Sequence, residues 1–170
     1  MEKIKRKRLV GEKVLLEPFC LEKAKEFFEL YQTSREVWNK FITLGVERYE
    51  DAIVYIAQQI KQDMTMAHFI IEKVSGKMVG FILGDRLNER FVARTRAIGV
   101  AFEGQGYAYE AGLLFDRLAN KAGFVGEVAF IEKENSHAID LAKRCGFTWQ
   151  TEMVVGWAKT VLEVYAKPLC

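Results

Sequence analysis

The stretch EGQGYAYEA, residues 103–111, joins an apolar run, AIGVAF, to a helical pattern, GLLFDRLANKAG. Gly104 and Gly106 carry no Cβ, so a ligand can approach their amides closely and the turn can adopt φ angles that other residues resist. The first N–H groups of the following helix have no intrahelical partner, and the helix dipole is positive at that end. A strand, a glycine loop and a helix in this order predict a site for an anion, most often a phosphate.

The glycine spacing excludes two common nucleotide motifs. The GxxxxGK[ST] pattern of ATP-binding P-loops is absent, and Tyr109 replaces the third glycine of a GxGxxG dinucleotide fingerprint. Gly-x-Gly alone is equally compatible with a tight turn that binds nothing. The loop alone therefore does not identify the ligand, and the rest of the chain has to indicate it.

Hydrophobic periodicity predicts the elements that position this loop. Helical spacing of apolar residues predicts helices over 21–31, 48–64, 107–122 and 135–144. Apolar runs bounded by turn residues predict strands over 13–18, 68–74, 78–85, 91–102, 125–133, 148–157 and 160–169. This order predicts an α+β, or mixed α/β, fold with a central, mostly antiparallel sheet of about seven strands flanked by about four helices.

Length and composition predict one globular domain over 1–170. Half of the residues are hydrophobic and 28% are charged, as in proteins with a sizeable core. No uncharged apolar run approaches the roughly 20 residues that cross a bilayer, and the basic N-terminus lacks the apolar stretch of a signal peptide. We therefore expect a cytoplasmic protein that does not contact membranes.

Cysteine, histidine and charge content weigh against three further classes. Three scattered cysteines without a CxxC pair, and only two histidines, argue against a structural zinc site or a disulfide framework. A net charge of +2 is too near neutral to indicate nucleic-acid binding. Nucleic-acid binding stays open as an alternative because the N-terminus contains a basic cluster, Lys3, Lys5, Arg6, Lys7 and Arg8. In that case binding would depend steeply on salt, and deletion of residues 1–8 would abolish it.

From the loop onward the chain resembles the GNAT superfamily of N-acetyltransferases. The family's loop often appears as (Q/R)GKGYA-x-EA, and here it is EGQGYAYEA. Relatives often place an Asn eleven positions before a Gly-Phe pair, which matches Asn135 and Gly146. The "IG" of AIGVAF and the run MVGFILGD also match family strands. The resemblance covers nearly the whole chain and is closest to the branch of the ribosomal-protein N-terminal acetyltransferases.

The resemblance implies acetyl-coenzyme A as acyl donor and no metal. The main-chain amides of the loop would hold the diphosphate of the donor; these are the amides of Gly104, Gln105, Gly106, Tyr107, Ala108 and Tyr109. The strand edge from Ile98 to Phe102 would pair with the pantetheine arm, where this strand splays from 125–133. The N–H of Val100 would stabilise the oxyanion, which makes Val100 the catalytic candidate.

Other residues have weaker assignments. Asn135 either contacts the pantetheine arm or caps a helix. The phosphate at the adenosine end could be met by Lys133, Lys143 and Arg144, which are otherwise solvated charges. The acceptor pocket, or the core, would contain Trp38, Phe41 and Tyr49.

The chain also departs from the family pattern. Glu103 replaces the usual Gln or Arg of the loop. Ala97, Ala138 and Ala142 stand where relatives carry the general base or the proton donor. Three carboxylates remain as substitutes or as surface charges: Glu47, Asp85 and Glu163.

The missing base bears on the acceptor. At pH 7 an α-amine is neutral about one time in ten, and a lysine about once in 2,500. A base-poor site therefore favours a peptide or protein N-terminus. A small amine or antibiotic, and a non-catalytic module that binds or senses acetyl-coenzyme A, remain as alternatives, and a homodimer stays open.

Overall fold

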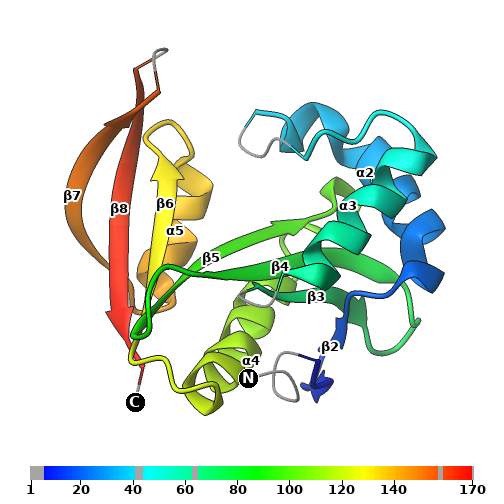
Figure 1. The fold of residues 1–170 in the computed structure, drawn as a ribbon, viewed down its shortest axis with the longest axis horizontal. Helices are drawn as coiled ribbons and strands as arrows, with labels where there is room; N and C mark the ends of the chain where they lie inside the picture. The colour runs from blue at the N-terminus through cyan, green and yellow to red at the C-terminus, as the bar shows by residue number, and fades with distance from the viewer. Residues whose placement is uncertain (1–5, 41–43, 63–64, 157–158, 170) are drawn as a thin grey trace.

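The computed structural model describes residues 6–40, 44–62, 65–156 and 159–169, and within these ranges eight strands form one sheet (Figure 1). The strands are β1 (Leu9–Val10), β2 (Val14–Pro18), β3 (Thr65–Glu72), β4 (Met78–Arg86), β5 (Phe91–Ile98), β6 (Gly126–Glu132), β7 (Thr148–Val155) and β8 (Thr160–Pro168). The helices are α2 (Ala24–Trp38), α3 (Tyr49–Lys61), α4 (Tyr107–Lys121) and α5 (Ser136–Arg144), with 3₁₀ turns η1 (Leu21–Lys23) and η2 (Val100–Phe102). The spatial order of the strands is β1-β2-β3-β4-β5-β6-β8-β7.

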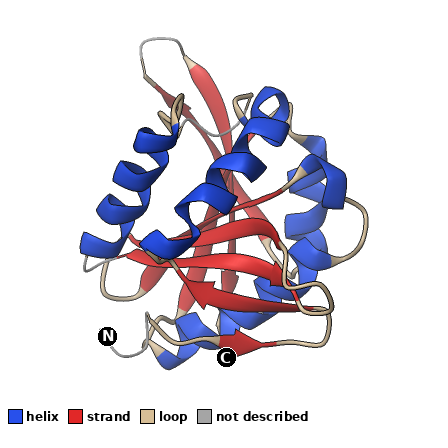
Figure 2. Cartoon of the chain, turned by 90° about the vertical axis from the view of Figure 1, so that its right-hand side faces the viewer, coloured by secondary structure: helices blue, strands red, loops and turns tan. Residues whose placement is uncertain are grey.

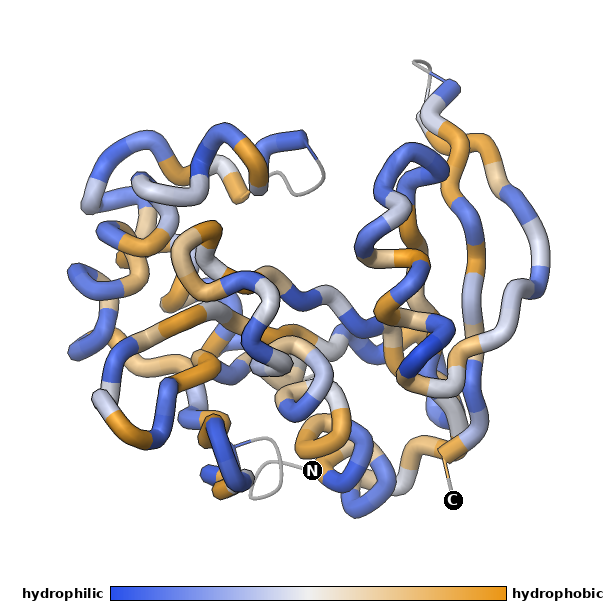
Figure 3. The backbone as a smooth tube through the Cα atoms, turned by 180° about the vertical axis from the view of Figure 1, so that it is seen from behind, coloured by the Kyte–Doolittle hydropathy of each residue, from blue (hydrophilic) through white to orange (hydrophobic). Residues whose placement is uncertain are grey.

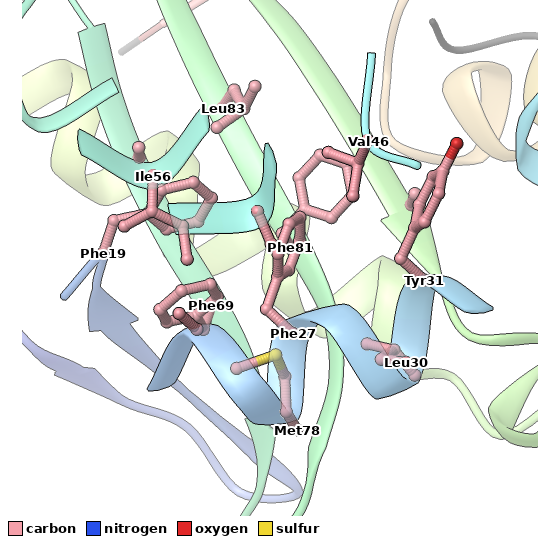
Figure 4. Packing of buried hydrophobic residues seen from close by; sticks show 14 of the residues in the cluster. Phe19, Phe27, Leu30, Tyr31, Val46, Ile56, Phe69, Met78, Phe81 and Leu83 are labelled. Carbon is pink, nitrogen blue, oxygen red and sulfur yellow. The ribbon is translucent and has the colours of Figure 1, made fainter. Parts of the chain in front are cut away.

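Helices cover both faces of the sheet (Figure 2). Helices α2 and α3 pack on one face, and the buried core beneath them contains six aromatic side chains. Phe19 stacks on Phe69 with ring centroids 4.2 Å apart, and Phe81 meets Phe27 edge-on at 5.8 Å (Figure 4). Helix α4 packs on the opposite face, and α5 covers β6 and β8.

Residue patterns account for these layers. Strand β4 is buried from Met78 to Gly84, since helices lie over both of its faces, and its sequence MVGFILG is accordingly an unbroken apolar run. The helices are buried on one side only. Figure 3 shows hydrophobic segments along each helix interrupted by hydrophilic turns, as one-sided burial requires.

The predicted fold class is confirmed, with three corrections to the elements. Residues Leu9–Val10 add a short strand that no periodicity indicated, and α2 extends to Trp38 because Ser34 and Trp38 continue its buried stripe. Strand β5 ends at Ile98 instead of at residue 102, and Val100–Phe102 form a 3₁₀ turn. Ile98 pairs with Gly80, and the Gly99 N–H still reaches the Val79 carbonyl of β4 before the chain turns into the 3₁₀ segment.

The sheet forks between β5 and β6. These two strands are parallel and pair over three positions, the last of which joins Ala93 to Val128. Beyond that point β5 continues to Ile98 beside β4, and β6 continues to Glu132 beside β8. Figure 1 shows the two strands side by side at one end and then running apart.

A cluster of buried charges lies at the base of this fork. Arg94 follows the last paired residue of β5, and its Nη1 lies 3.1 Å from Glu127 of β6 and 2.9 Å from Asp116 of α4. Lys167 of β8 reaches Asp116 at 2.5 Å. Burial raises the pKa of Glu127 to about 7, against the opposing attraction of Arg94. The cluster thus joins both arms of the fork to one helix.

Gly112 makes room for two arginines beneath the fork. A Cβ at this position would lie 2.6 Å from Nη1 of Arg96 and 3.3 Å from Nη1 of Arg94. Arg96 donates to the Ala108 carbonyl at 2.9 Å. Burial, and then the like charge of Arg94, lower the pKa of Arg96 to about 10. A glycine inside α4 therefore serves packing rather than helix propensity.

Removal of one charged partner from the cluster at the base of the fork should destabilise the fold. We expect Arg94→Met to lower the free energy of unfolding by about 3–5 kcal/mol, because Glu127 then stays buried without its nearest cation. The double variant Arg94→Met/Glu127→Gln should recover part of that loss. Urea unfolding measures both. Lys133→Met breaks the exposed pair with Glu152 and is the control, at about 0–1 kcal/mol. A cost for Arg94→Met as small as that of the control would contradict a coupled cluster.

His68 gives the protein a pH-dependent stability. Its side chain is fully buried, and its Nε2 lies 2.8 Å from the Lys7 carbonyl. Burial lowers the pKa of His68 to about 4. The unfolded chain therefore binds a proton at a higher pH than the folded chain does, so stability is lost as the pH falls from about 6.5 to about 4.

We expect this loss to total on the order of 3 kcal/mol. Urea unfolding as a function of pH should show a shallower decline for His68→Gln than for the wild type over that range. His137→Gln is the matched control, since His137 is exposed. Parallel profiles for all three proteins would show that His68 does not titrate in this way.

Candidate functional site

The glycine loop has the geometry of an anion site. Gly104 and Gly106 have φ angles of +75° and +82°, in the left-handed region. No heavy atom lies within 4 Å of the position that a Cβ on Gly104 would occupy. Gly106 is the N-cap of α4, and no side chain caps the helix there. The amides of the first turn are therefore available to a ligand.

Glu110 explains the "EA" of the motif. Its carboxylate accepts hydrogen bonds from the amides of Glu12 at 2.9 Å, Lys13 at 2.8 Å and Val14 at 2.7 Å. These amides belong to the turn between β1 and β2. A residue that the motif supplies thus fastens the first turn of α4 to the N-terminal hairpin, and its role is structural.

Tyr107 faces the protein. Its ring is buried, and its hydroxyl donates to the Glu72 carboxylate of β3 and lies 3.0 Å from Oε1 of Gln105. Hydrogen bonds from Ser75 and then Tyr107 hold the pKa of Glu72 below its usual range. These contacts fix the side chains of the loop and leave its main chain as the part that can meet a ligand.

The free edge of β5 lies closer to the fork than predicted. Gly99 donates its N–H to the Val79 carbonyl of β4 at 2.7 Å. Because main-chain groups alternate in direction along a strand, the N–H groups of Arg96 and Ile98 point away from β4, toward the gap left by β6. The edge that can pair with an extended ligand is therefore 94–98.

Val100 lies beyond this edge. Its N–H donates to the Oγ of Ser34 at 3.1 Å, and Ser34 is buried in α2. In addition, the Trp38 indole N–H donates to the Ile98 carbonyl at 2.9 Å. Two side chains of α2 thus hold the chain where it leaves β5, and the amide of Val100 is already engaged.

The remaining donor-site candidates lie on or near α5. The Asn135 side chain accepts from the Ala138 amide at 3.2 Å and caps the helix. The guanidinium of Arg144 lies 5.6 Å from the centre of the Tyr109 ring, so it reaches the first turn of α4. Lys133 pairs with Glu152 at 3.2 Å, and Lys143 is exposed.

The residues suggested for the acceptor side are dispersed. Trp38 belongs to the core, with Phe81 edge-on at 5.3 Å. Tyr49 is exposed and meets the Phe28 ring at 6.1 Å. Phe41 lies outside the residues that the structure describes.

The three unassigned carboxylates lie apart from one another. Asp85 is exposed at the end of β4, opposite Ala93, and its charge adds to burial in raising the pKa of Tyr55. Glu163 on β8 accepts from the Trp149 indole at 2.6 Å. The Glu47 carbonyl accepts from Arg35 at 3.2 Å, just before α3. Of the three, Asp85 is the one beside the fork.

Two general features complete the description. Over the described ranges, no group of three His, Cys, Asp or Glu side chains is arranged to hold a metal ion. No helix in the same ranges is long and apolar enough to cross a membrane.

Comparison with solved structures shows the same fold in acetyltransferases. The microcin C7 self-immunity acetyltransferase MccE, in complex with acetyl-CoA and AMP, is 18% identical with a TM-score of 0.84, over 93% of each chain. The ribosomal L7/L12 α-N-protein acetyltransferase RimL, in complex with coenzyme A, is 14% identical with a TM-score of 0.87, over 96% of this chain and 98% of that one.

A third structure is the Salmonella typhimurium acetyltransferase that modifies the N-terminal serine of ribosomal protein L7/L12. It is 12% identical with a TM-score of 0.87, over 96% of this chain and all of that one. A search of the curated proteins found no match.

The sequence itself matches the family model of the acetyltransferase (GNAT) domain over residues 13–148. That range contains the glycine loop, the strands β5 and β6 that form the fork, and the helices α4 and α5 that follow them. The chain belongs to the GNAT family of acetyltransferases.

Proposed function

We propose that this protein transfers the acetyl group of acetyl-coenzyme A to a primary amine, and that its acceptor is the N-terminus of a protein or peptide. The observation that carries the proposal is the left-handed glycine loop at the uncapped start of α4, beside a forked sheet. The complexes of MccE with acetyl-CoA and of RimL with coenzyme A support the choice of donor.

The loop fits the diphosphate of the donor. The amides of 104–109 supply hydrogen-bond donors, and the helix dipole adds a positive potential. The space beside Gly104 is open. The pantetheine arm would then extend along the free edge of β5, and Asn135 at the start of α5 would face it from the other arm of the fork.

The oxyanion donor should come from that free edge. The Val100 amide is engaged by Ser34, whereas the N–H groups of Arg96 and Ile98 point into the fork. In the transfer the amine nitrogen attacks the thioester carbon, the C–N bond forms and the C–S bond breaks. A main-chain N–H within hydrogen-bond distance of the carbonyl oxygen stabilises the charge that develops on it.

The protonation state of the acceptor supports an N-terminal amine. Ala97 and Ala142 are buried, Ala138 is half-buried, and none of the three can accept or donate a proton through its side chain. A site without a strong base works best with an amine that is already neutral, and positioning in a ternary complex supplies much of the rate. The amine proton would pass to water, or to Asp85 beside the fork.

A small amine is the second candidate acceptor, since the solved structures with this fold include an acetyltransferase of microcin C7 self-immunity as well as those that act on ribosomal protein L7/L12. A module that binds acetyl-coenzyme A without turnover is the third reading, since Ala97, Ala138 and Ala142 remove the usual proton-transfer side chains. Release of free thiol with a panel of amines separates the two enzymatic readings from the third.

Substitution of Gly106 tests the donor site. Gly106→Val should abolish detectable coenzyme A binding in calorimetry, because a β-branched residue resists a φ of +82° and its Cβ would lie 3.3 Å from Nζ of Lys13. Gly123→Val is the matched control: Gly123 has a φ of +96° after the far end of α4, with open space around it. Equal affinity in the two variants would remove the loop from the proposal.

Acceptor choice is tested with paired peptides. At pH 7 we expect a peptide with a free α-amine to react about 250 times faster than an N-blocked peptide with one lysine, which is the ratio of their neutral fractions. Thiol release under saturating acetyl-coenzyme A measures both rates. Comparable rates would argue against an N-terminal acceptor, and tight donor binding without any thiol release would favour the sensor.

A further inference from the structure

The loop lacks its own cation. Between Arg96 and Arg117 the chain contains no lysine or arginine, while Glu103 and Glu110 both lie in this stretch. Main-chain amides and a helix dipole supply only partial charges. A diphosphate carries at least two negative charges, so a full positive charge from elsewhere in the fold would strengthen its binding.

Lys13 brings such a charge to the loop. Its Nζ lies 3.3 Å from the Gln105 carbonyl, across 92 positions of sequence. The same atom would be 3.3 Å from a Cβ on Gly106. The ammonium group therefore lies over the middle of the loop, next to the glycine that begins α4.

The main chain holds Lys13 in this place. Its N–H donates to both oxygens of Glu110, at 2.8 Å and 3.1 Å, and its carbonyl accepts from the Lys73 amide at 2.9 Å. Thus Glu110 fastens to α4 the same residue whose side chain reaches the loop. The arrangement fixes where the side chain begins and limits the conformational entropy lost when a ligand binds.

The ammonium group keeps donors for a ligand. A lysine has three N–H donors, and one of them reaches the Gln105 carbonyl. Across the described part of the chain, no carboxylate forms an ion pair with Lys13. A charged group with free donors next to an anion cradle matches the chemistry of a phosphate oxygen.

We infer that Lys13 is a donor-binding residue that pairs with the diphosphate of acetyl-coenzyme A and offsets the charge of Glu103. This inference rests on the proposed function. It names a side chain from the N-terminal hairpin as part of a site that the motif assigns wholly to α4 and its loop.

The test measures donor affinity by calorimetry for Lys13→Met, Lys13→Arg and Lys121→Met. Lys121 ends α4 about 20 Å along the helix axis from the loop, so it is the charge-matched control. We expect Lys13→Met to weaken coenzyme A about tenfold, with a smaller dependence on salt. Lys13→Arg should retain most of the affinity, and Lys121→Met all of it.

Two further ligands identify the group that Lys13 contacts. Lys13→Met should weaken 3′-dephospho-coenzyme A by the same factor as coenzyme A, since both contain the diphosphate. The value of kcat/KM with S-acetylpantetheine, which has no phosphate, should not change. A loss confined to coenzyme A would assign Lys13 to the 3′-phosphate and overturn the inference, and an equal loss with S-acetylpantetheine would make the role of Lys13 merely structural.

The remaining outcomes are also decisive. Wild-type affinity in Lys13→Met, or an affinity of Lys13→Arg as low as that of Lys13→Met, would show that the charge is not used. If the wild type itself binds no coenzyme A, the proposed function fails. If the wild type binds and only the variants fail to differ, the inference about Lys13 alone is wrong.

Discussion

The architecture depends on an interruption: β5 and β6 pair at three positions and then separate. Both strands stay ordered past that point because each retains a second neighbour, β4 for one and β8 for the other. Main-chain N–H and C=O groups along the inner edges therefore have no partner strand across the fork. Only the short turn η2 separates the glycine loop from β5, so the loop and the free edge belong to one continuous segment of the chain.

Separation of two strands leaves main-chain polar groups without their usual partners. In this protein, side chains form ion pairs and hydrogen bonds at both ends of the free edge. Arg94 and Glu127 lie on opposite arms at the base of the fork, and Asp116 joins them to α4. At the outer end of β5, Ser34 and Trp38 of α2 take up the main-chain groups of Val100 and Ile98. Helices α4 and α2 thus each cover part of the core and also hold one end of the free edge of β5.

The sequence predicted the layers well because burial alternates in the usual periods. Helix α4 and the hairpin of β3 and β4 follow directly from apolar spacing. The end of β5 did not, since AIGVAF is apolar throughout and its composition does not show where the strand gives way to the 3₁₀ turn. The amide of Val100, the predicted oxyanion donor, lies past that end and donates to Ser34, and its catalytic role stays a prediction.

Long-range contacts of charged side chains were also beyond the reach of sequence patterns. Lys13 and Glu110 are 97 positions apart, and although Glu110 belongs to the loop motif, no pattern in the sequence links Lys13 to it. Glu127 and Arg94 look like ordinary polar positions of strands, yet both are buried. Only the strand pairing brings these residues together.

Gly112 has a consequence for how relatives of this chain can diverge. Its missing side chain leaves the room that two guanidinium groups occupy. An alanine there would suit the helix better in isolation, but its Cβ would lie 2.6 Å from Nη1 of Arg96, so this guanidinium would have to shift. A larger residue at position 112 should therefore be accompanied in relatives by a rearranged or shorter side chain at position 96.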